Sequence, residues 1–133
     1  MRNMAKAKVF IVDDDPTFIK ILERELLENK LTPFEKYLTG EDCLNNLNHK
    51  PKLVLLDFSL VGLNGLDVLR QIKEKSPKTE VIMLTAVEDT DVKEKCLAAG
   101  ATNYINKNPD GLERLREEVF PIYKKRGILG LFK

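Results

Sequence analysis

The chain has 133 residues, an ordinary size for one domain that builds a core without disulfides or a structural metal. Its 22 Lys and Arg residues against 21 Asp and Glu residues leave a formal net charge of +1, so no overall field favours direct binding of nucleic acid. With 43% hydrophobic and 32% charged residues, the composition is that of a soluble globular protein.

Cys43 and Cys96 lie in stretches with a helical pattern and lack the spacing of a metal site, so we interpret them as reduced, small hydrophobic residues. No segment reaches the length of a membrane span, and residues 1–6 lack the apolar centre of a signal peptide. We therefore expect a cytoplasmic protein.

The first predicted strand, residues 8–12, ends in three consecutive acids, Asp13, Asp14 and Asp15. A helix is expected from Pro16 to about residue 29, with Pro16 at its first position and Asp15 as its N-cap. Capping therefore explains Asp15, but it leaves Asp13 and Asp14 without a structural role.

A weaker strand is predicted over 31–38, where Pro33 favours a sheet edge. Thr39 opens a short helix with a soft end. His49, the only histidine, is expected in a loop as an ordinary solvated side chain.

The third strand, 53–56, is a run of four aliphatic residues that ends on Asp57, a pattern typical of a strand buried on both faces. Gly62 and Gly65 allow a tight loop after it. Asn64 is the expected cap of a helix that ends at Ser76-Pro77.

The fourth strand, 80–84, ends on Thr85, and Asp89 or Thr90 caps the helix that follows, with Gly100 at its end. The fifth strand, 101–106, ends on Lys107. The fifth helix begins near Pro109, and Pro121 is expected to kink it rather than stop it.

Five strand–helix units in succession predict an α/β domain with parallel strands, right-handed crossovers and helices on both faces. We assign residues 1–126 to this domain and 127–133 to a basic and apolar tail. The tail is expected to fray or to pack on the body; docking on a membrane surface or a partner is the alternative.

The carboxyl ends of parallel strands lie along one edge, so Asp13, Asp14, Asp57, Thr85 and Lys107 are expected to converge there. Three close carboxylates repel one another unless a cation joins them, and oxygen ligands suit Mg²⁺. A carboxylate beside such a metal can accept a phosphoryl group, which a lysine and a hydroxyl can help to neutralise. The pattern therefore favours a phosphoryl-handling site.

The chain resembles the response-regulator receiver family of two-component signalling over roughly residues 8–125. The resemblance rests on Val12-Asp13-Asp14, Leu55-Leu56-Asp57, the Gly62 and Gly65 loop, Leu84-Thr85-Ala86, and the segment from Gly100-Ala101 through Tyr104 to Lys107. It implies a flavodoxin-like (βα)5 doubly wound parallel sheet with strand order 2-1-3-4-5.

The resemblance also implies a role for each site residue. Asp57 would be the phosphoacceptor. Asp14 would bind Mg²⁺ directly, Asp13 mainly through water, and Ser59 through its backbone carbonyl. The remaining roles are the phosphate contacts and the switch: Lys107 would pair with Asp57 or its phosphate, Thr85 would bond the phosphoryl group, and Tyr104 would follow Thr85 inward.

Two positions depart from the family pattern. Val61 stands where Pro is usual, and Lys107-Asn108 replaces a Lys-Pro pair whose peptide bond is cis. A cis bond before Asn108 would cost several kcal/mol more than one before proline, so a trans bond or a shifted loop is expected there.

The expected function is a phosphorelay receiver. A sensor histidine kinase or histidine phosphotransfer protein would supply the phosphoryl group, and a downstream protein would bind the face of the fourth helix, fifth strand and fifth helix. The chain would catalyse only its own phosphorylation and dephosphorylation, so it is not expected to be an enzyme on an outside substrate. A phosphorylation-dependent dimer is left open. The alternative is a phosphorylation-independent interaction module. A phosphohydrolase ranks lower, because Ser59 stands where that class of enzyme needs a second acid. A flavodoxin also ranks lower, because the acidic loop after the first strand would repel the phosphate of a flavin.

Overall fold

Short apolar runs form the centre of a five-stranded parallel sheet. In the computed structural model, which describes residues 8–126, the central strands β1 (Val9–Val12) and β3 (Leu53–Leu56) are buried at every position. β4 (Glu80–Thr85) lies beside β3, while β2 (Phe34–Tyr37) and β5 (Asn103–Asn106) form the edges. All four pairings are parallel and the order is β2-β1-β3-β4-β5, which confirms the predicted flavodoxin-like topology.

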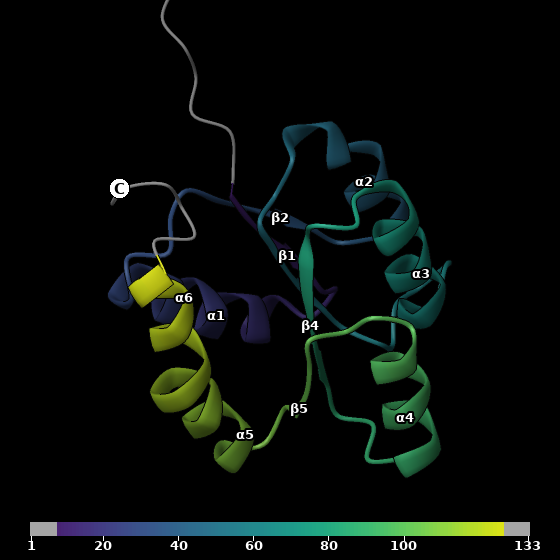
Figure 1. Cartoon of the computed structure of the whole chain (residues 1–133). Coiled ribbons are helices and arrows are strands. Elements are labelled where there is room, and N and C mark those ends of the chain that lie inside the picture. Colours follow the sequence, from purple (N-terminus) through teal and green to yellow (C-terminus); the bar gives the residue numbers. More distant parts are fainter. Residues whose placement is uncertain (1–7, 127–133) are drawn as a thin grey trace, which may run out of the picture.

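Helices cover both faces of the sheet (Figure 1). One face carries α1 (Pro16–Glu28), α5 (Pro109–Arg114) and α6 (Phe120–Arg126). The other carries α2 (Gly40–Asn45), α3 (Gly65–Lys75) and α4 (Thr90–Ala98). This layering fits the predicted doubly wound fold.

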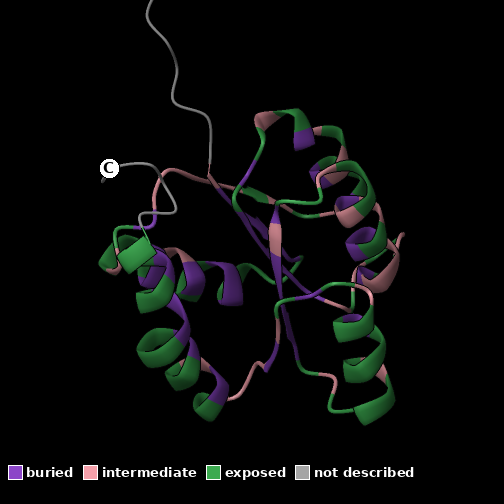
Figure 2. Ribbon diagram, in the orientation of Figure 1, coloured by how far each residue is buried: buried purple, intermediate pink, exposed green. Residues whose placement is uncertain are grey.

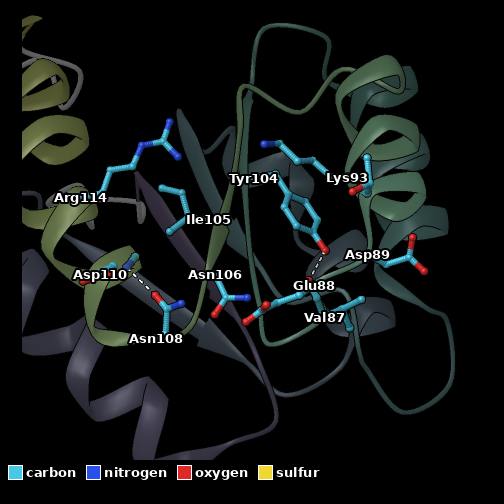
Figure 3. Close-up of a pocket in the computed structure, with 12 residues that line it drawn as sticks. Val87, Glu88, Asp89, Lys93, Tyr104, Ile105, Asn106, Asn108, Asp110 and Arg114 are labelled. Carbon is cyan, nitrogen blue, oxygen red and sulfur yellow. Dashed lines mark hydrogen bonds between the residues drawn. The ribbon is translucent and has the colours of Figure 1, made fainter.

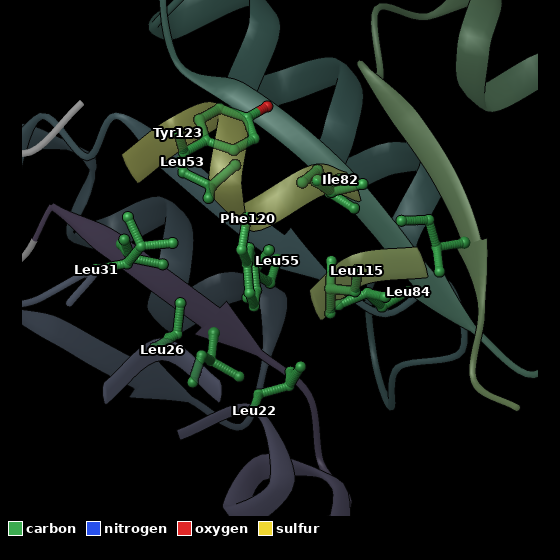
Figure 4. Close-up of a cluster of buried hydrophobic side chains, with 14 of the residues drawn as sticks. Leu22, Leu26, Leu31, Leu53, Leu55, Ile82, Leu84, Leu115, Phe120 and Tyr123 are labelled. Atoms are coloured by element: carbon green, nitrogen blue, oxygen red, sulfur yellow. The ribbon is translucent and has the colours of Figure 1, made fainter. Parts of the chain in front are cut away.

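Side chains alternate between two cores along each strand, because successive strand residues point to opposite faces. Val9 and Ile11 enter the core under α1 and α6, whereas Phe10 and Val12 enter the core under α2 and α3. The central strands β1 and β3 are buried throughout and the edge strand β2 is partly exposed, while the helices expose their outer sides (Figure 2). In the first core the fully buried Phe120 lies among leucines from the strands and from α1 (Figure 4).

Side-chain caps fix where α1, α2, α3 and α4 begin. Asp15 accepts from the Thr17 N–H at 3.0 Å, and Thr39 accepts from the Asp42 N–H at 3.1 Å. Two more caps are formed by Asn64 and Asp89 at the starts of α3 and α4. These are the expected caps, and they orient the loops that leave the strand ends.

The last helix passes through Pro121 without stopping. A π-helical turn, Leu115–Val119, lies between α5 and α6, and the Phe120 N–H bonds Leu115 O, five residues back. Proline cannot donate to the residue four back and its ring crowds that carbonyl, so a wider turn just before Pro121 lets the helix continue.

Some expectations differ from the structure. β2 and β5 are shorter than the predicted 31–38 and 101–106, and β2 begins only after Pro33. His49 is not an ordinary solvated side chain: it is half-buried, and its Nδ1 lies 3.2 Å from Glu35 Oε1 on the edge strand. The proposed tail, 127–133, lies outside the described residues. Over residues 8–126, every helix is too short or too polar to cross a bilayer.

Candidate functional site

Three carboxylates meet at the carboxyl edge of the sheet. β1 delivers Asp13 and Asp14, and β3 delivers Asp57, because the two strands pair in register and end side by side. One oxygen from each of the three lies within 4.8 Å of the others. Asp13 is 2% exposed and Asp57 6% exposed, whereas Asp14 is open to solvent. The predicted convergence of the acids is therefore present in the fold.

Lys107 joins the two buried acids. Its Nζ lies 2.7 Å from Asp13 Oδ2 and 3.0 Å from Asp57 Oδ2, and its side chain is only 11% exposed. The ammonium also lies 4.5 Å from the centre of the Phe18 ring on α1, close enough for a cation–π contact. One lysine from β5 thus offsets part of the charge of acids from two other strands.

The pKa of Asp13 is raised above its ordinary value. Burial is the largest cause and repulsion from Asp57 adds to it, while Lys107 and the Asp15 N–H offset part of the rise. Burial lowers the pKa of Lys107, but its bonds to Asp13 and Asp57 outweigh that effect and the net shift is upward. Lys107 is therefore charged at neutral pH, and the cluster retains a demand for further positive charge.

The loop after β3 holds Asp57 in place. The Ser59 N–H donates to Asp57 Oδ1 at 3.1 Å, so each oxygen of this carboxylate has one donor. A Cβ on Gly65 would lie 2.5 Å from the Asp57 carbonyl oxygen, and the Gly65 N–H bonds Phe58 O at 2.8 Å. The first turn of α3 therefore sits directly on the Asp57 peptide, which only glycine permits.

The Val87 backbone links Thr85 to Tyr104 through two hydrogen bonds. The fully buried Thr85 hydroxyl accepts from the Val87 N–H at 3.2 Å, and the Tyr104 hydroxyl donates to the Val87 carbonyl at 2.7 Å. Figure 3 shows the Tyr104 ring pointing from β5 toward Val87. Burial raises the pKa of Tyr104 to about 12, so the phenol keeps its proton.

Asn108 replaces the usual proline without disturbing the start of α5. Within residues 8–126 the one cis peptide bond precedes Pro33, so the Lys107–Asn108 bond is trans, as predicted. Asn108 Oδ1 accepts from the Gly111 N–H at 2.7 Å and thereby caps α5. Gly111 also allows the helix to approach Asn106 closely, since a Cβ there would overlap the Asn106 carbonyl.

The donor set fits a hard divalent cation. The cluster offers only oxygen ligands, one of its acids is exposed, and its charge is incompletely balanced by Lys107. Mg²⁺ binds such sites through a few carboxylates and keeps several waters. Within the described chain, Asp13, Asp14 and Asp57 are the group that could hold one.

Sequence reasoning missed three contacts of the site, and two of them have no signal in the sequence. Phe18 reads as an ordinary core residue of α1, and nothing in its spacing predicts that Lys107 lies over it. The Val87 backbone links Thr85 and Tyr104 although its side chain carries no suitable chemistry. Asn108 could have been recognised as a cap from the Pro and Gly that follow it.

Comparison with known proteins agrees with this geometry. A family model described as the response regulator receiver domain matches residues 9–120. A cyclic di-GMP phosphodiesterase from Thermotoga maritima is 33% identical over 120 residues, covering 89% of this chain and 31% of that protein. Across this enzyme and two other curated relatives, NtrC and ArlR, the chain spans between 22% and 53% of their length.

Solved structures give the same family. A BeF3-activated receiver domain of DrrB is 35% identical with a TM-score of 0.74, covering 87% of this chain and 97% of that one. In a CheX–CheY–BeF3–Mg complex from Borrelia burgdorferi, a matching chain is 26% identical with a TM-score of 0.78, covering 86% of this chain and 87% of that one. The fold, the acid cluster and the match over residues 9–120 together lead to one conclusion: the chain belongs to the response regulator receiver domain family.

Proposed function

We propose that the chain is a phosphoacceptor of a two-component relay and that Asp57 carries the phosphoryl group. The observation behind this proposal is the setting of the Asp57 carboxylate, which has the Ser59 N–H on one oxygen and the Lys107 ammonium on the other. It stands at a sheet edge with two further acids. Such a carboxylate is held ready for attack on phosphorus.

The transfer balances as follows. A carboxylate oxygen of Asp57 forms the new O–P bond, the N–P bond of a phosphohistidine donor breaks, and the imidazole leaves with its electron pair and takes up a proton. Lys107 lies 3.0 Å from the Asp57 oxygen, so it is placed to neutralise the incoming phosphoryl oxygens. The Thr85 hydroxyl accepts a hydrogen bond from the Val87 N–H, and its own proton is left to donate to a phosphoryl oxygen.

We assign the metal to Asp14 and Asp57 directly, to Asp13 through water and to the Ser59 carbonyl. The exposure of Asp14 and the engagement of Asp13 by Lys107 and the Asp15 N–H support this division. When bound, Mg²⁺ supplies positive charge that offsets the phosphoryl oxygens in the transition state.

The readout would be the surface of α4, β5 and α5. A cavity of about 460 Å³ lies on this surface, between the segment that leads into α4 (87–90) and the start of α5, and Tyr104 lines it. A change at Thr85 would reach this surface through Val87 and Tyr104. A sensor histidine kinase or a histidine phosphotransfer protein would donate the phosphoryl group, and a downstream protein would bind this surface. The chain would work in the cytoplasm and would catalyse only its own phosphorylation and dephosphorylation.

The direct test is phosphorylation with Mg²⁺ and a small-molecule phosphodonor, followed by intact-protein mass spectrometry. We expect wild type to gain one phosphoryl group that is acid-stable and labile to hydroxylamine. Asp57→Asn should gain none, whereas Asp67→Asn on α3 serves as the matched control and should behave as wild type. A wild-type protein that gains no phosphoryl group under these conditions would refute the proposal.

A phosphorylation-independent docking module is the second candidate. One observation favours it: the buried Tyr104 is held in place by its hydrogen bond to the Val87 carbonyl, a contact made within the chain itself. A partner that binds this surface equally well in phosphorylated wild type and in Asp57→Asn would support the docking module instead.

A further inference from the structure

A groove lined by lysines lies at the amino edge of the sheet, at the far end from Asp57. Its cavity has a volume of about 630 Å³, within the usual range for small-molecule sites. Four lysines line it: Lys50, Lys52, Lys75 and Lys78. Lys52 precedes β3 and Asp57 follows it, so the groove and the acid cluster are about 16 Å apart along the strand.

The charge of the groove is of one sign. No Asp or Glu is among its lining residues, and all four lysines are exposed. Between residues 8 and 126 none of the four takes part in an ion pair. Since the whole chain is nearly neutral, this concentration of positive charge is local rather than a property of the composition.

The two walls of the groove are tied together before any ligand arrives. The buried Thr79 hydroxyl donates to the Pro51 carbonyl at 2.7 Å, and the Glu80 N–H bonds Lys52 O at 3.0 Å. Lys73 holds the second wall by donating to Pro77 O and Thr79 O at 2.9 and 2.7 Å. The backbone of the groove is therefore fixed before binding, so the loss of conformational entropy on binding is confined to the lysine side chains.

The lining residues indicate which anion would fit. Lysine ammonium groups bind phosphate as point charges. Leu47, Pro51 and Pro77 supply apolar surface, and no aromatic side chain lines the groove to stack on a base. A polyphosphate carries charge on each successive phosphoryl group, whereas an extended acidic peptide turns alternate side chains away. The closely spaced charges of a polyphosphate therefore suit a groove of this size better than an acidic peptide does.

We propose that this groove binds a linear polyphosphate group, with Lys50 and Lys52 on one wall and Lys75 and Lys78 on the other. Inorganic tripolyphosphate and a nucleoside triphosphate are the two sources of that group. Without an aromatic contact for the base, the groove holds both through the phosphates alone. The site is independent of phosphorylation at Asp57.

The test is isothermal titration calorimetry with tripolyphosphate and with ATP, in EDTA so that no metal bridges the ligand to the acid cluster. Wild type should bind both with affinities within about threefold of each other, and binding should weaken steeply with salt. Reversal of two groove charges in Lys52→Glu/Lys78→Glu should weaken binding by about tenfold or more, because like charges then face each other. Tighter binding of ATP alone would assign the nucleoside triphosphate as the ligand.

The control reverses two exposed lysines elsewhere, Lys20→Glu/Lys95→Glu, and should lower the affinity by less than about twofold. An equal loss in both variants would overturn the proposal, since binding would then follow net charge alone. Amide chemical shifts of wild type provide a second measurement that needs no variant. Shifts are expected at residues 50–52 and 75–79; shifts confined to the acid edge, or no binding at millimolar ligand, would also overturn it.

Discussion

The two ends of the sheet carry opposite charge and hold it in different ways. At the carboxyl end Asp13 and Asp57 are buried, and Lys107 lies within 3.0 Å of both. At the amino end four lysines surround an open groove and stay exposed. Buried like charges are tolerated only where an opposite charge joins them, whereas water screens exposed ones singly. A single charge change should therefore matter far more at the carboxyl end.

The largest effect is expected from Lys107→Met. This substitution leaves two buried carboxylates without their cation, so we expect the free energy of unfolding in EDTA to fall by about 3 kcal/mol. Urea denaturation measures it. Mg²⁺ should restore part of the loss, because it replaces the missing charge. Lys52→Met at the other end is the control and should change stability by less than about 0.5 kcal/mol. Similar losses of unfolding free energy in Lys107→Met and Lys52→Met would contradict the expected difference between the two ends of the sheet.

A smaller effect is expected from Mg²⁺ itself. If the cluster binds the ion, a concentration ten times the dissociation constant should stabilise the fold by about 1.4 kcal/mol, visible as a rise in melting temperature. Asp14→Asn should remove most of this response without lowering the stability in EDTA, since Asp14 is exposed and the loss of its charge relieves repulsion from Asp13 and Asp57. Asp91→Asn on α4 should respond as wild type does. A full Mg²⁺ response in Asp14→Asn would show that the ion binds elsewhere.

The smallest effect concerns Glu80 at the amino end. Burial raises its pKa, but hydrogen bonds from Tyr123 and Arg126 outweigh burial and hold the pKa below its ordinary 4.5. A lowered pKa adds stability at neutral pH that is lost as the pH falls through the folded value. Glu80→Gln should cost only about 0.5 kcal/mol at pH 7, because Arg126 is half-exposed.

The difference between wild type and Glu80→Gln should close as the pH is lowered below 4.5. Denaturant midpoints measured from pH 7 to pH 3 would follow it. A gap that widens toward acid would contradict the assignment of Glu80 as the ionised partner.

The succession of strands and helices and the identity of the strand-end residues followed from local pattern, because apolar runs and capping residues act over a few positions. The strand order β2-β1-β3-β4-β5 was expected only from the family resemblance. The long-range contacts did not. Glu25 and Arg116 are 91 residues apart, yet they pair at 2.9 Å with Glu25 95% buried. His49 ends the short 3-10 helix Leu47–His49, and it meets Glu35 of β2 although 14 residues separate them in the chain. Such pairs depend on how whole helices and loops pack on the sheet, and the spacing of residues along the chain does not predict that packing.

Lys107 illustrates the same limit at the site. Its place at the end of β5 is readable from the sequence, but its simultaneous contact with Asp13 and Asp57 is not. That contact requires the tip of one side chain to reach the ends of two other strands. The ring of Phe18 beneath the ammonium is a further consequence of how α1 packs.

Gly65 limits how this site can be re-engineered. A side chain there would meet the Asp57 carbonyl at 2.5 Å and Phe58 as closely, so any library that varies this position moves the acceptor peptide itself. Val61, 74% exposed in the same loop, and the exposed Ser59 carry no such constraint. A designer who wants to change the chemistry around Asp57 without shifting its backbone therefore has these two adjustable positions beside one fixed one.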